Sequence, residues 1–339
     1  MRYLSGPASE VLVDRGLPDP LLPVREGRRK VLVLSQPGTD FLAPAIVDRL
    51  DDVEPVVVPV PDRDEAKTLG VLDIVYHRCA EAGIGRHDTI LGVGGGATTD
   101  LAGFVAATWL RGVESVLLPT TLLGAVDAAI GGKTGINLGG KNMVGAFWPP
   151  SRVIVDLDVL DSLPRDIKVE GTAEVYKTGL VGDPAIVDAY RDHGIDAPLE
   201  LVVPAAIAVK TSVVIEDLRE SGRRAILNFG HTIGHAVEFA SGLAHGHAVS
   251  IGMVAAVTVS ERRLGFNHKD EVISDLDALG LPVNAPEVDR DHLMSLVERD
   301  KKIDAAGIRM VLLSEIGEPV IDHVTTADIA AGLAAIGIS

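Results

Sequence analysis

The chain has 339 residues and 47% of them are apolar, so it can bury a core large enough for two domains. Its formal net charge is −17 and no run of Lys or Arg forms a basic tail, which argues against nucleic acid or an anionic membrane surface as a partner. The single cysteine, Cys79, excludes an internal disulfide, and residues 1–16 lack the apolar core of a signal peptide. We therefore expect a cytoplasmic protein with no membrane partner.

The first half of the chain alternates strand-like and helix-like segments. Residues 66–83 have helical spacing of apolar side chains. Short runs rich in Val, Leu and Ile predict strands: KVLVLS (30–35), VEPVVVPV (53–60), DTILGVGGG (88–96), SVLLPTT (115–121) and VIVDLD (153–158). This alternation predicts an α/β fold, with an N-terminal Rossmann-like parallel-sheet domain over residues 1–160.

The second half reads as a C-terminal, mostly α-helical domain over residues 161–339. The segments with helical periodicity are GTAEVYKTGLVG (171–182), PAAIAVKTSVVIEDLRE (204–220), HTIGHAVEFASG (231–242) and DEVISDLDALG (270–280). A short strand is expected near the end, at GIRMVLL (307–313).

A glycine turn, Gly94 to Gly96, follows the strand at 88–96 and opens a helix. Glycines allow the backbone to approach a phosphate, and a helix N-terminus favours negative charge. The same pattern also suits an ordinary tight turn. Asp100 is either a helix cap or an acceptor for a bound nucleotide. Thr120 and Thr121 either cap a helix or donate hydroxyls to the same cofactor.

Residues 125–147 combine many glycines with Asp127, Lys133, Lys141 and Asn142 in a mostly apolar stretch. Because glycine lowers helix stability by up to about 1 kcal/mol per residue, we expect no regular element here. The two lysines indicate a loop that binds an anion. The alternative is a solvated surface loop, although its apolar neighbours argue for burial.

A carboxylate and several histidines lie in the helical half. Glu174 and Lys177 are three residues apart, and His231 and His235 are four apart, so each pair shares a helical face. His245 precedes an apolar helix. One Glu with two His is a common set of ligands for a divalent metal, whereas a surface ion pair and structural histidines are the alternative.

Further cations accompany this set, namely Lys210, Arg224, Lys301 and Lys302. An acidic protein that keeps cations beside glycine loops and a possible metal favours a small multivalent anion as its ligand.

The motifs together resemble the 3-dehydroquinate synthase family of sugar phosphate cyclases. They are GGGATTDLAGFVAATWLRG (94–112), LPTTLLGAVDAAIGGKTGIN (118–137), GKNMVGAFWPP (140–150), AEVYKTGLVGD (173–183), AILNFGHTIGHAVE (225–238) and HGHAVSIGM (245–253). They occur in the family's order, and the resemblance extends from about residue 30 to 313.

The resemblance implies an enzyme that converts 3-deoxy-D-arabino-heptulosonate 7-phosphate into 3-dehydroquinate and phosphate, in the shikimate pathway to aromatic amino acids. It implies NAD and a divalent metal, zinc or cobalt, as cofactors, and a homodimer. Residues 1–160 would then bind NAD, and residues 161–339 would bind metal and substrate.

The resemblance also assigns individual residues. The metal ligands it implies are Glu174, His231 and His245. The substrate and catalytic residues it implies are Arg111, Asp127, Lys133, Lys141, Asn142, Lys177, Lys210, Arg224, Asn228, His235, Lys301 and Lys302. The cofactor contacts it implies are Asp64, Lys67, Gly94, Gly95, Gly96, Asp100, Thr120, Thr121 and Ser162, together with Asp127, Lys133, Lys141 and Asn142.

The chain departs from the family pattern at a few positions. Near the expected adenosine half of NAD, Arg63 replaces Gly and Asp64 replaces Glu. The loop before Asn142 is one residue shorter than usual. His247 stands where an acidic residue is common, and Ser162 where Thr is usual.

Three alternatives remain at this point: another cyclase similar to 2-epi-5-epi-valiolone synthase, a metal-dependent polyol dehydrogenase, and an inactive binding protein on the same fold. The lysines and arginines favour a carboxylated substrate, because a carboxylate needs cationic partners.

Overall fold

The computed structural model describes residues 1–6, 9–50, 52–220, 222–300 and 308–338, so Lys301 and Lys302 lie outside the described residues. The chain forms two compact units, Met1–Leu163 with Lys210–Arg219, and Pro164–Val209 with Glu220–Ser339. This division differs from a single break after residue 160, because Lys210–Arg219 groups with the first unit. The binding roles expected for the two parts stay predictions.

The first unit contains a seven-stranded sheet in the order β1-β2-β9-β6-β5-β3-β4. Neighbouring strands run parallel, except that β1 is antiparallel to β2. The strands are β1 Arg2–Gly6, β2 Ser9–Asp14, β3 Lys30–Ser35, β4 Glu54–Pro59, β5 Thr89–Gly94, β6 Glu114–Pro119 and β9 Arg152–Asp156. The parallel sheet predicted from the sequence is confirmed.

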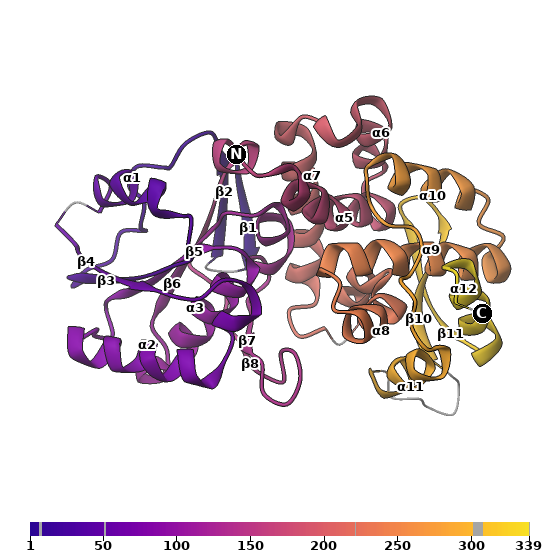
Figure 1. The fold of residues 1–339 in the computed structure, drawn as a ribbon. Helices are drawn as coiled ribbons and strands as arrows, with labels where there is room; N and C mark the ends of the chain where they lie inside the picture. Colours follow the sequence, from indigo (N-terminus) through magenta and orange to yellow (C-terminus); the bar gives the residue numbers. More distant parts are fainter. Residues whose placement is uncertain (7–8, 51, 221, 301–307, 339) are drawn as a thin grey trace. The chain divides into compact units, whose positions relative to one another are not determined.

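Helices cover both faces of this sheet. Figure 1 shows α1 on one face and α2 and α3 on the other. Every residue of β5 is therefore buried, as is usual for a central parallel strand. The helices are α1 Ala43–Val47, α2 Leu69–Ala82, α3 Gly96–Thr108 and α4 Leu157–Asp161, with short turns η1 Asp40–Leu42, η2 Arg63–Ala66, η3 Trp109–Arg111 and η4 Gly124–Ala128.

The glycine-rich stretch at 125–147 is more regular than its sequence indicates. It contains a two-stranded hairpin, β7 Lys133–Ile136 with β8 Val144–Phe147, so the expectation of no regular element was wrong. Gly135 and Gly145 explain the difference. A Cβ at Gly145 would lie 2.4 Å from the Thr134 carbonyl oxygen, and one at Gly135 would lie 2.8 Å from that of Val144. The glycines disfavour a helix but allow these two strands to pair closely.

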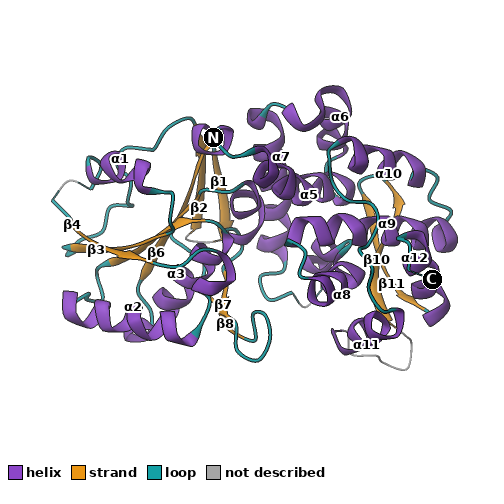
Figure 2. Ribbon diagram, viewed as in Figure 1, coloured by secondary structure: helices purple, strands orange, loops and turns teal. Residues whose placement is uncertain are grey.

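The second unit is mainly helical, as expected (Figure 2). Its predicted strand is present as β10 Ile308–Glu315, which pairs antiparallel with β11 Glu318–Val324. The helices are α5 Arg165–Val181, α6 Pro184–His193, α8 His231–Ser241, α9 His245–Leu264, α10 Lys269–Ala278, α11 Arg290–Asp300 and α12 Thr326–Ala335, with η5 Gly194–Asp196 and η6 Arg223–Asn228; α7 Leu199–Glu216 continues into the first unit. In the described ranges, no helix has the length and apolar character needed to cross a membrane.

The carboxylate of Asp88 stabilises the turn before β5, and its substitution gives a testable prediction about stability. Its carboxylate accepts hydrogen bonds from the backbone N–H groups of Gly85 (2.7 Å), Arg29 (2.9 Å) and Lys30 (2.9 Å). Burial raises the pKa of Asp88, but these hydrogen bonds more than offset it, so the pKa lies below its usual value. The resulting stabilisation is complete above the pKa of the unfolded chain, about 4, and is lost as the pH falls through the folded value.

We expect Asp88→Asn to lower the free energy of unfolding at pH 7 by about 1–3 kcal/mol, because one carboxylate oxygen is replaced by a donor that faces N–H groups. In urea titrations this difference from the original protein should shrink below about pH 4. Asp73→Asn, at a side chain that is 73% exposed, is the matched control. A difference that stays constant between pH 7 and pH 3 would contradict this role.

Candidate functional site

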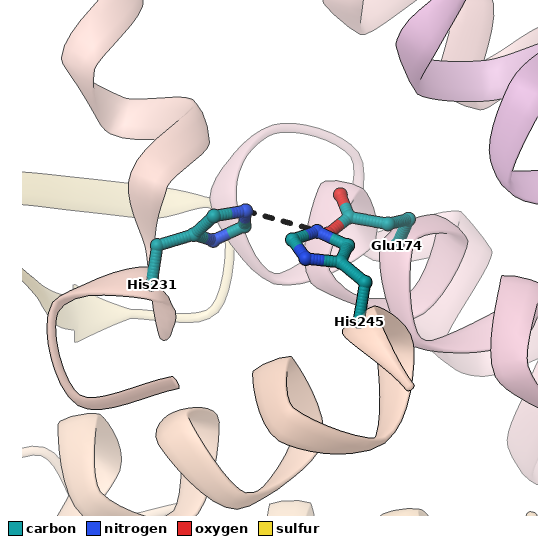
Figure 3. A group of neighbouring side chains, drawn as sticks. All are labelled: Glu174, His231 and His245. Atoms are coloured by element: carbon teal, nitrogen blue, oxygen red, sulfur yellow. Dashed lines mark ion pairs between the residues drawn. The ribbon is translucent and has the colours of Figure 1, made fainter. Parts of the chain in front are cut away.

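Three side chains predicted as metal ligands converge in the second unit (Figure 3). Glu174 comes from the middle of α5, and His231 and His245 are the first residues of α8 and α9. Glu174 Oε1 lies 3.5 Å from His231 Nε2 and 3.4 Å from His245 Nε2. One ligand atom from each residue lies within 4.8 Å of the other two. His247 belongs to neither metal-capable group among the described residues.

Close helix contacts bring these residues together. A Cβ at Gly234 of α8 would lie 2.9 Å from the Ala248 carbonyl oxygen, so only glycine allows α8 to approach α9 this closely. A Cβ at Gly246 would lie 2.0 Å from the carbonyl oxygen of Glu170, one turn before Glu174 on α5. The glycines of the histidine motifs therefore set the distance between the three helices.

Each imidazole directs its Nε2 atom toward the carboxylate. His231 Nδ1 lies 3.1 Å from the carbonyl oxygen of Phe229, and His245 Nδ1 lies 3.1 Å from Glu238 Oε2. Carbonyl and carboxylate oxygens only accept hydrogen bonds, so both Nδ1 atoms carry the hydrogen. The two Nε2 atoms are then the ones that face Glu174.

The carboxylate of Glu174 has two unlike oxygens. Lys177 donates to Oε2, and this pair is buried, with side chains 2% and 1% exposed, so the interpretation as a surface ion pair was wrong. Oε1 is also buried but accepts no hydrogen bond within the described part of the chain. A buried acceptor without a donor is costly. A divalent cation between Oε1 and the two Nε2 atoms would satisfy it, so these residues fit a metal.

Burial and neighbouring charges together shift the pKa values of the three side chains. Burial and the nearby Lys177 lower the pKa of His231, which keeps this imidazole neutral. Burial also raises the pKa of Glu174, but Lys177 and the two histidines lower it well below its usual value. Burial lowers the pKa of His245, yet its neighbours Glu174 and Glu238 raise it to about 10.

The other predicted residues of the second unit have contacts or burial of their own. His235 stacks edge-on against His231, with 5.0 Å between ring centroids. Asn228 donates to Glu220 Oε1 at 2.6 Å. Arg224 is buried in η6, with 3% of its surface exposed.

In the first unit, the glycine turn joins β5 to α3. A Cβ at Gly94 would lie 2.7 Å from Thr98 Oγ1 and 2.8 Å from Gln36 Oε1, so glycine is required there. Gly95 N donates to Gln36 Oε1 at 2.7 Å, and α3 has no side-chain N-cap. Uncapped amides at the start of a 13-residue helix suit a phosphate.

The hydroxyl and carboxyl groups near this turn have defined roles. Asp100 lies inside α3 and is not its cap; instead it accepts a hydrogen bond from Lys67. Thr121 Oγ1 accepts from Gly124 N at 3.1 Å, so Thr121 does cap the turn that follows β6. Thr120 is buried, and its N–H donates to the Gly94 carbonyl oxygen at 2.9 Å.

Two polar groups form around the buried lysines Lys67 and Lys210 in the same unit. Lys67 donates to both Asp100 and Asn142. Lys210 donates to the backbone carbonyl and the carboxylate of Asp127. Burial raises the pKa of Asp100, which also lies in the field of Asp127. The structure thus gathers five residues that were predicted from dispersed motifs.

The remaining predicted residues lie nearer the surface. Lys141 Nζ pairs with Asp64 Oδ2 at 3.0 Å, with both side chains half exposed. Lys133 opens β7 and is exposed. Ser162 Oγ donates to the Val159 carbonyl oxygen at 2.7 Å, and Arg111 is exposed at the end of η3. Among the described residues, neither Ser162 nor Arg111 bonds to the polar groups around Lys67 and Lys210.

Two residues of these sites were not identified from the sequence. Gln36 follows β3, where a single polar residue carries no recognisable pattern. Glu238 had a usable signal, because His231, His235 and Glu238 recur at i, i+4 and i+7 on one face of a helix.

Comparison with known proteins decides the family. Residues 57–170 match the family model described as 3-dehydroquinate synthase N-terminal, and residues 171–303 match 3-dehydroquinate synthase C-terminal. The chain belongs to the 3-dehydroquinate synthase family. It is therefore a member of an enzyme family, as its motifs indicated.

Individual members of the 3-dehydroquinate synthase family are also similar to this chain in sequence. The 3-dehydroquinate synthase of Thermobifida fusca is 49% identical over 285 residues, which cover 80% of this chain and 76% of that protein. The one from Paenarthrobacter aurescens is 42% identical over 326 residues, covering 91% of this chain and 89% of the relative.

Solved structures of related cyclases share the fold. A 2-deoxy-scyllo-inosose synthase, complexed with carbaglucose-6-phosphate, NAD⁺ and Co²⁺, is 25% identical with a TM-score of 0.88 and full coverage of both chains. The 2-epi-5-epi-valiolone synthase of Streptomyces hygroscopicus, with NAD⁺ and Zn²⁺ bound, is 27% identical with a TM-score of 0.86 and 96% coverage of both. A glycerol dehydrogenase of Schizosaccharomyces pombe is 19% identical with a TM-score of 0.67, and it covers 99% of this chain and 90% of its own. This last similarity concerns the fold alone.

Proposed function

We propose that this chain is a 3-dehydroquinate synthase. It converts 3-deoxy-D-arabino-heptulosonate 7-phosphate into 3-dehydroquinate and phosphate by transient NAD-dependent oxidation, phosphate elimination, re-reduction and intramolecular aldol closure. The observation that carries the proposal is the convergence of the buried Glu174 Oε1 with two imidazole Nε2 atoms, at 3.5 and 3.4 Å, in a chain whose matches to this family extend over residues 57–303.

Glu174, His231 and His245 would hold the divalent metal, zinc or cobalt. When bound, such a cation acidifies a substrate hydroxyl and so prepares the carbon that carries it for oxidation. Lys177 holds Glu174 by its Oε2 atom, which leaves Oε1 directed at the imidazoles. His235, beside His231, faces the substrate hydroxyls.

NAD, when bound, would supply reversible hydride acceptance for the transient oxidation. The backbone of Gly94 to Gly96 and the first turn of α3 receive its phosphates. Lys67, Asp100 and Asn142 form the polar group that contacts the cofactor, together with Thr120, Thr121 and Ser162. Asp64 contacts the ribose, and its pair with Lys141 must open if both side chains engage the ligand.

The anionic groups of the substrate bind to the cations of the chain. Lys210 and Arg224 receive the carboxylate, and Asp127 keeps Lys210 in place. Lys133 and Asn228 complete the substrate contacts, and Arg111 and Lys141 bind near the phosphate. Lys301 and Lys302 add positive charge. We further propose that the protein works as a homodimer in the cytoplasm.

Another sugar phosphate cyclase is the second candidate, because the similar solved structures are cyclases of this kind. Their identities are 25% and 27%, whereas the 3-dehydroquinate synthases reach 42% and 49%. The higher identities favour the carboxylated substrate.

Recycling of the cofactor gives a direct test of the reaction type. Because the hydride returns to the same substrate, we expect phosphate release over many turnovers without accumulation of NADH. Phosphate and absorbance at 340 nm should be followed together in one reaction with the heptulosonate phosphate, NAD and zinc. NADH formed in step with phosphate would instead indicate a polyol dehydrogenase.

A further inference from the structure

Glu238 is a buried carboxylate to which the proposed reaction assigns no part. It lies on α8, two turns after His231 and one turn after His235, with only 8% of its surface exposed. Its Oε2 atom lies 3.1 Å from His245 Nδ1. A buried charge of this kind costs free energy unless it is paired, and His245 is one group that pairs with it.

The contact fixes which nitrogen of His245 faces Glu174. A carboxylate without its proton can only accept a hydrogen bond, so Nδ1 carries the hydrogen. Nε2, on the other side of the ring, then faces Glu174 Oε1, 3.4 Å away, and is the nitrogen that can offer a lone pair to a cation that displaces its proton. The ring is held between two carboxylates that contact opposite nitrogens.

His231 provides an internal comparison. Its Nδ1 is held by the backbone carbonyl of Phe229, an acceptor that no side-chain substitution removes. The two imidazoles are therefore oriented in the same way but by different groups, and only the group behind His245 can be changed by mutation.

We propose that Glu238 is a positioning residue for His245: it fixes the tautomer and plane of the ring and adds negative charge behind it, so that Nε2 binds a divalent cation more tightly. The inference rests on the metal site of the proposed function. Carboxylates behind a ligating imidazole raise its basicity, and their loss costs about 10–100-fold in metal affinity.

A second cation is the competing explanation, because ligand atoms of His235, Glu238 and His245 also lie within 4.8 Å of one another. The hydrogen bond argues against it. His245 cannot give Nδ1 to a second cation while that atom donates to Glu238, and serving two cations would require a fully deprotonated ring. The positioning role needs no such change.

The test measures metal binding by the full chain, without NAD or substrate. Zinc affinity is obtained by competition with a chromophoric chelator, and the ligand field is read from the visible spectrum of the cobalt-loaded protein. We expect Glu238→Ala to raise the zinc Kd by about 10–100-fold, with one zinc per chain retained and a shifted cobalt spectrum. Glu238→Gln, whose amide oxygen can still accept from Nδ1 but carries no negative charge, should raise the Kd measurably, by up to about 10-fold, and should also shift the cobalt spectrum.

The matched control is Asp328→Asn. Asp328 is also a buried carboxylate of the second unit, but it closes the capping box of α12. This variant should lose thermal stability and keep the zinc Kd and the cobalt spectrum. An effect on metal binding in Glu238 variants alone then separates positioning from general destabilisation.

Three outcomes would overturn the inference. The first is an unchanged Kd and cobalt spectrum in Glu238→Ala, or in Glu238→Gln if the alanine variant does not fold. The second is a second equivalent of zinc in the original protein that Glu238→Ala no longer binds. The third is an original protein that binds no zinc, which would also remove the proposed metal site, whereas the first two leave that site intact.

Discussion

Replacing His231 by alanine should abolish metal binding and lower kcat/KM for the heptulosonate phosphate by at least about 10³-fold, because a bound cation contributes several kcal/mol to transition-state stabilisation. Glu174→Gln and His245→Ala should behave in the same way, since Glu174 Oε1 lies within 3.5 Å of both imidazole Nε2 atoms. Metal analysis of the purified variants and steady-state kinetics with added zinc or cobalt provide the measurement.

His247→Ala is the control for this series. His247 is two residues from His245 on the same helix, yet it belongs to neither metal-capable group among the described residues. We expect this variant to retain its metal and most of its activity. Full metal content in all three ligand variants, or metal loss confined to His247→Ala, would show that the site has been misplaced.

Loss of a single buried cation should weaken the enzyme's preference for the carboxylated sugar phosphate. Lys210 and Arg224 are 6% and 3% exposed, and Asp127 already pairs with Lys210. We propose that both cations also bind the substrate carboxylate, an anionic group that sedoheptulose 7-phosphate, with a neutral hydroxymethyl group in that place, does not offer. We expect Lys210→Met and Arg224→Met each to lower kcat/KM for the carboxylated substrate by roughly 10–150-fold, since a charged hydrogen bond contributes about 1.5–3 kcal/mol.

The same variants should affect sedoheptulose 7-phosphate much less, so the gap between the two substrates narrows. Lys269→Met is the matched control, because Lys269 pairs with Glu261 at the surface, at 2.7 Å. Equal losses for both sugars in the Lys210 and Arg224 variants would point to a role in folding or in binding a shared group. Equal turnover of both sugars by the unmodified protein would contradict the choice of substrate itself.

The architecture could be predicted because local pattern and tertiary structure agree in this chain. Runs such as KVLVLS are buried from both sides in a parallel sheet, and the alternation with helices leaves few other arrangements. The hairpin at 133–147 was missed because glycine was weighed only as a helix breaker. In the hairpin, glycine allows two backbones to approach each other closely. This effect depends on the partner strand and cannot be predicted from one segment alone.

The candidate site was predicted mainly through the resemblance of whole motifs. Helical spacing placed His231 and His235 on one face, and the structure brings His245 and Glu174 to the same group. Spacing within a helix cannot reveal that Lys177 is held by Glu174 in the interior or that Lys67 reaches Asn142. Such contacts join residues far apart along the chain or depend on burial, and the roles of these residues in binding stay predictions.

The most direct test of the account is to incubate the purified, zinc-loaded protein with NAD and 3-deoxy-D-arabino-heptulosonate 7-phosphate and to identify the products by NMR. The account predicts 3-dehydroquinate and phosphate in equal amounts, with NAD unchanged at the end, and no product after the metal is removed with a chelator. Failure to form 3-dehydroquinate with metal and NAD bound, or equal formation after complete metal removal, would contradict it.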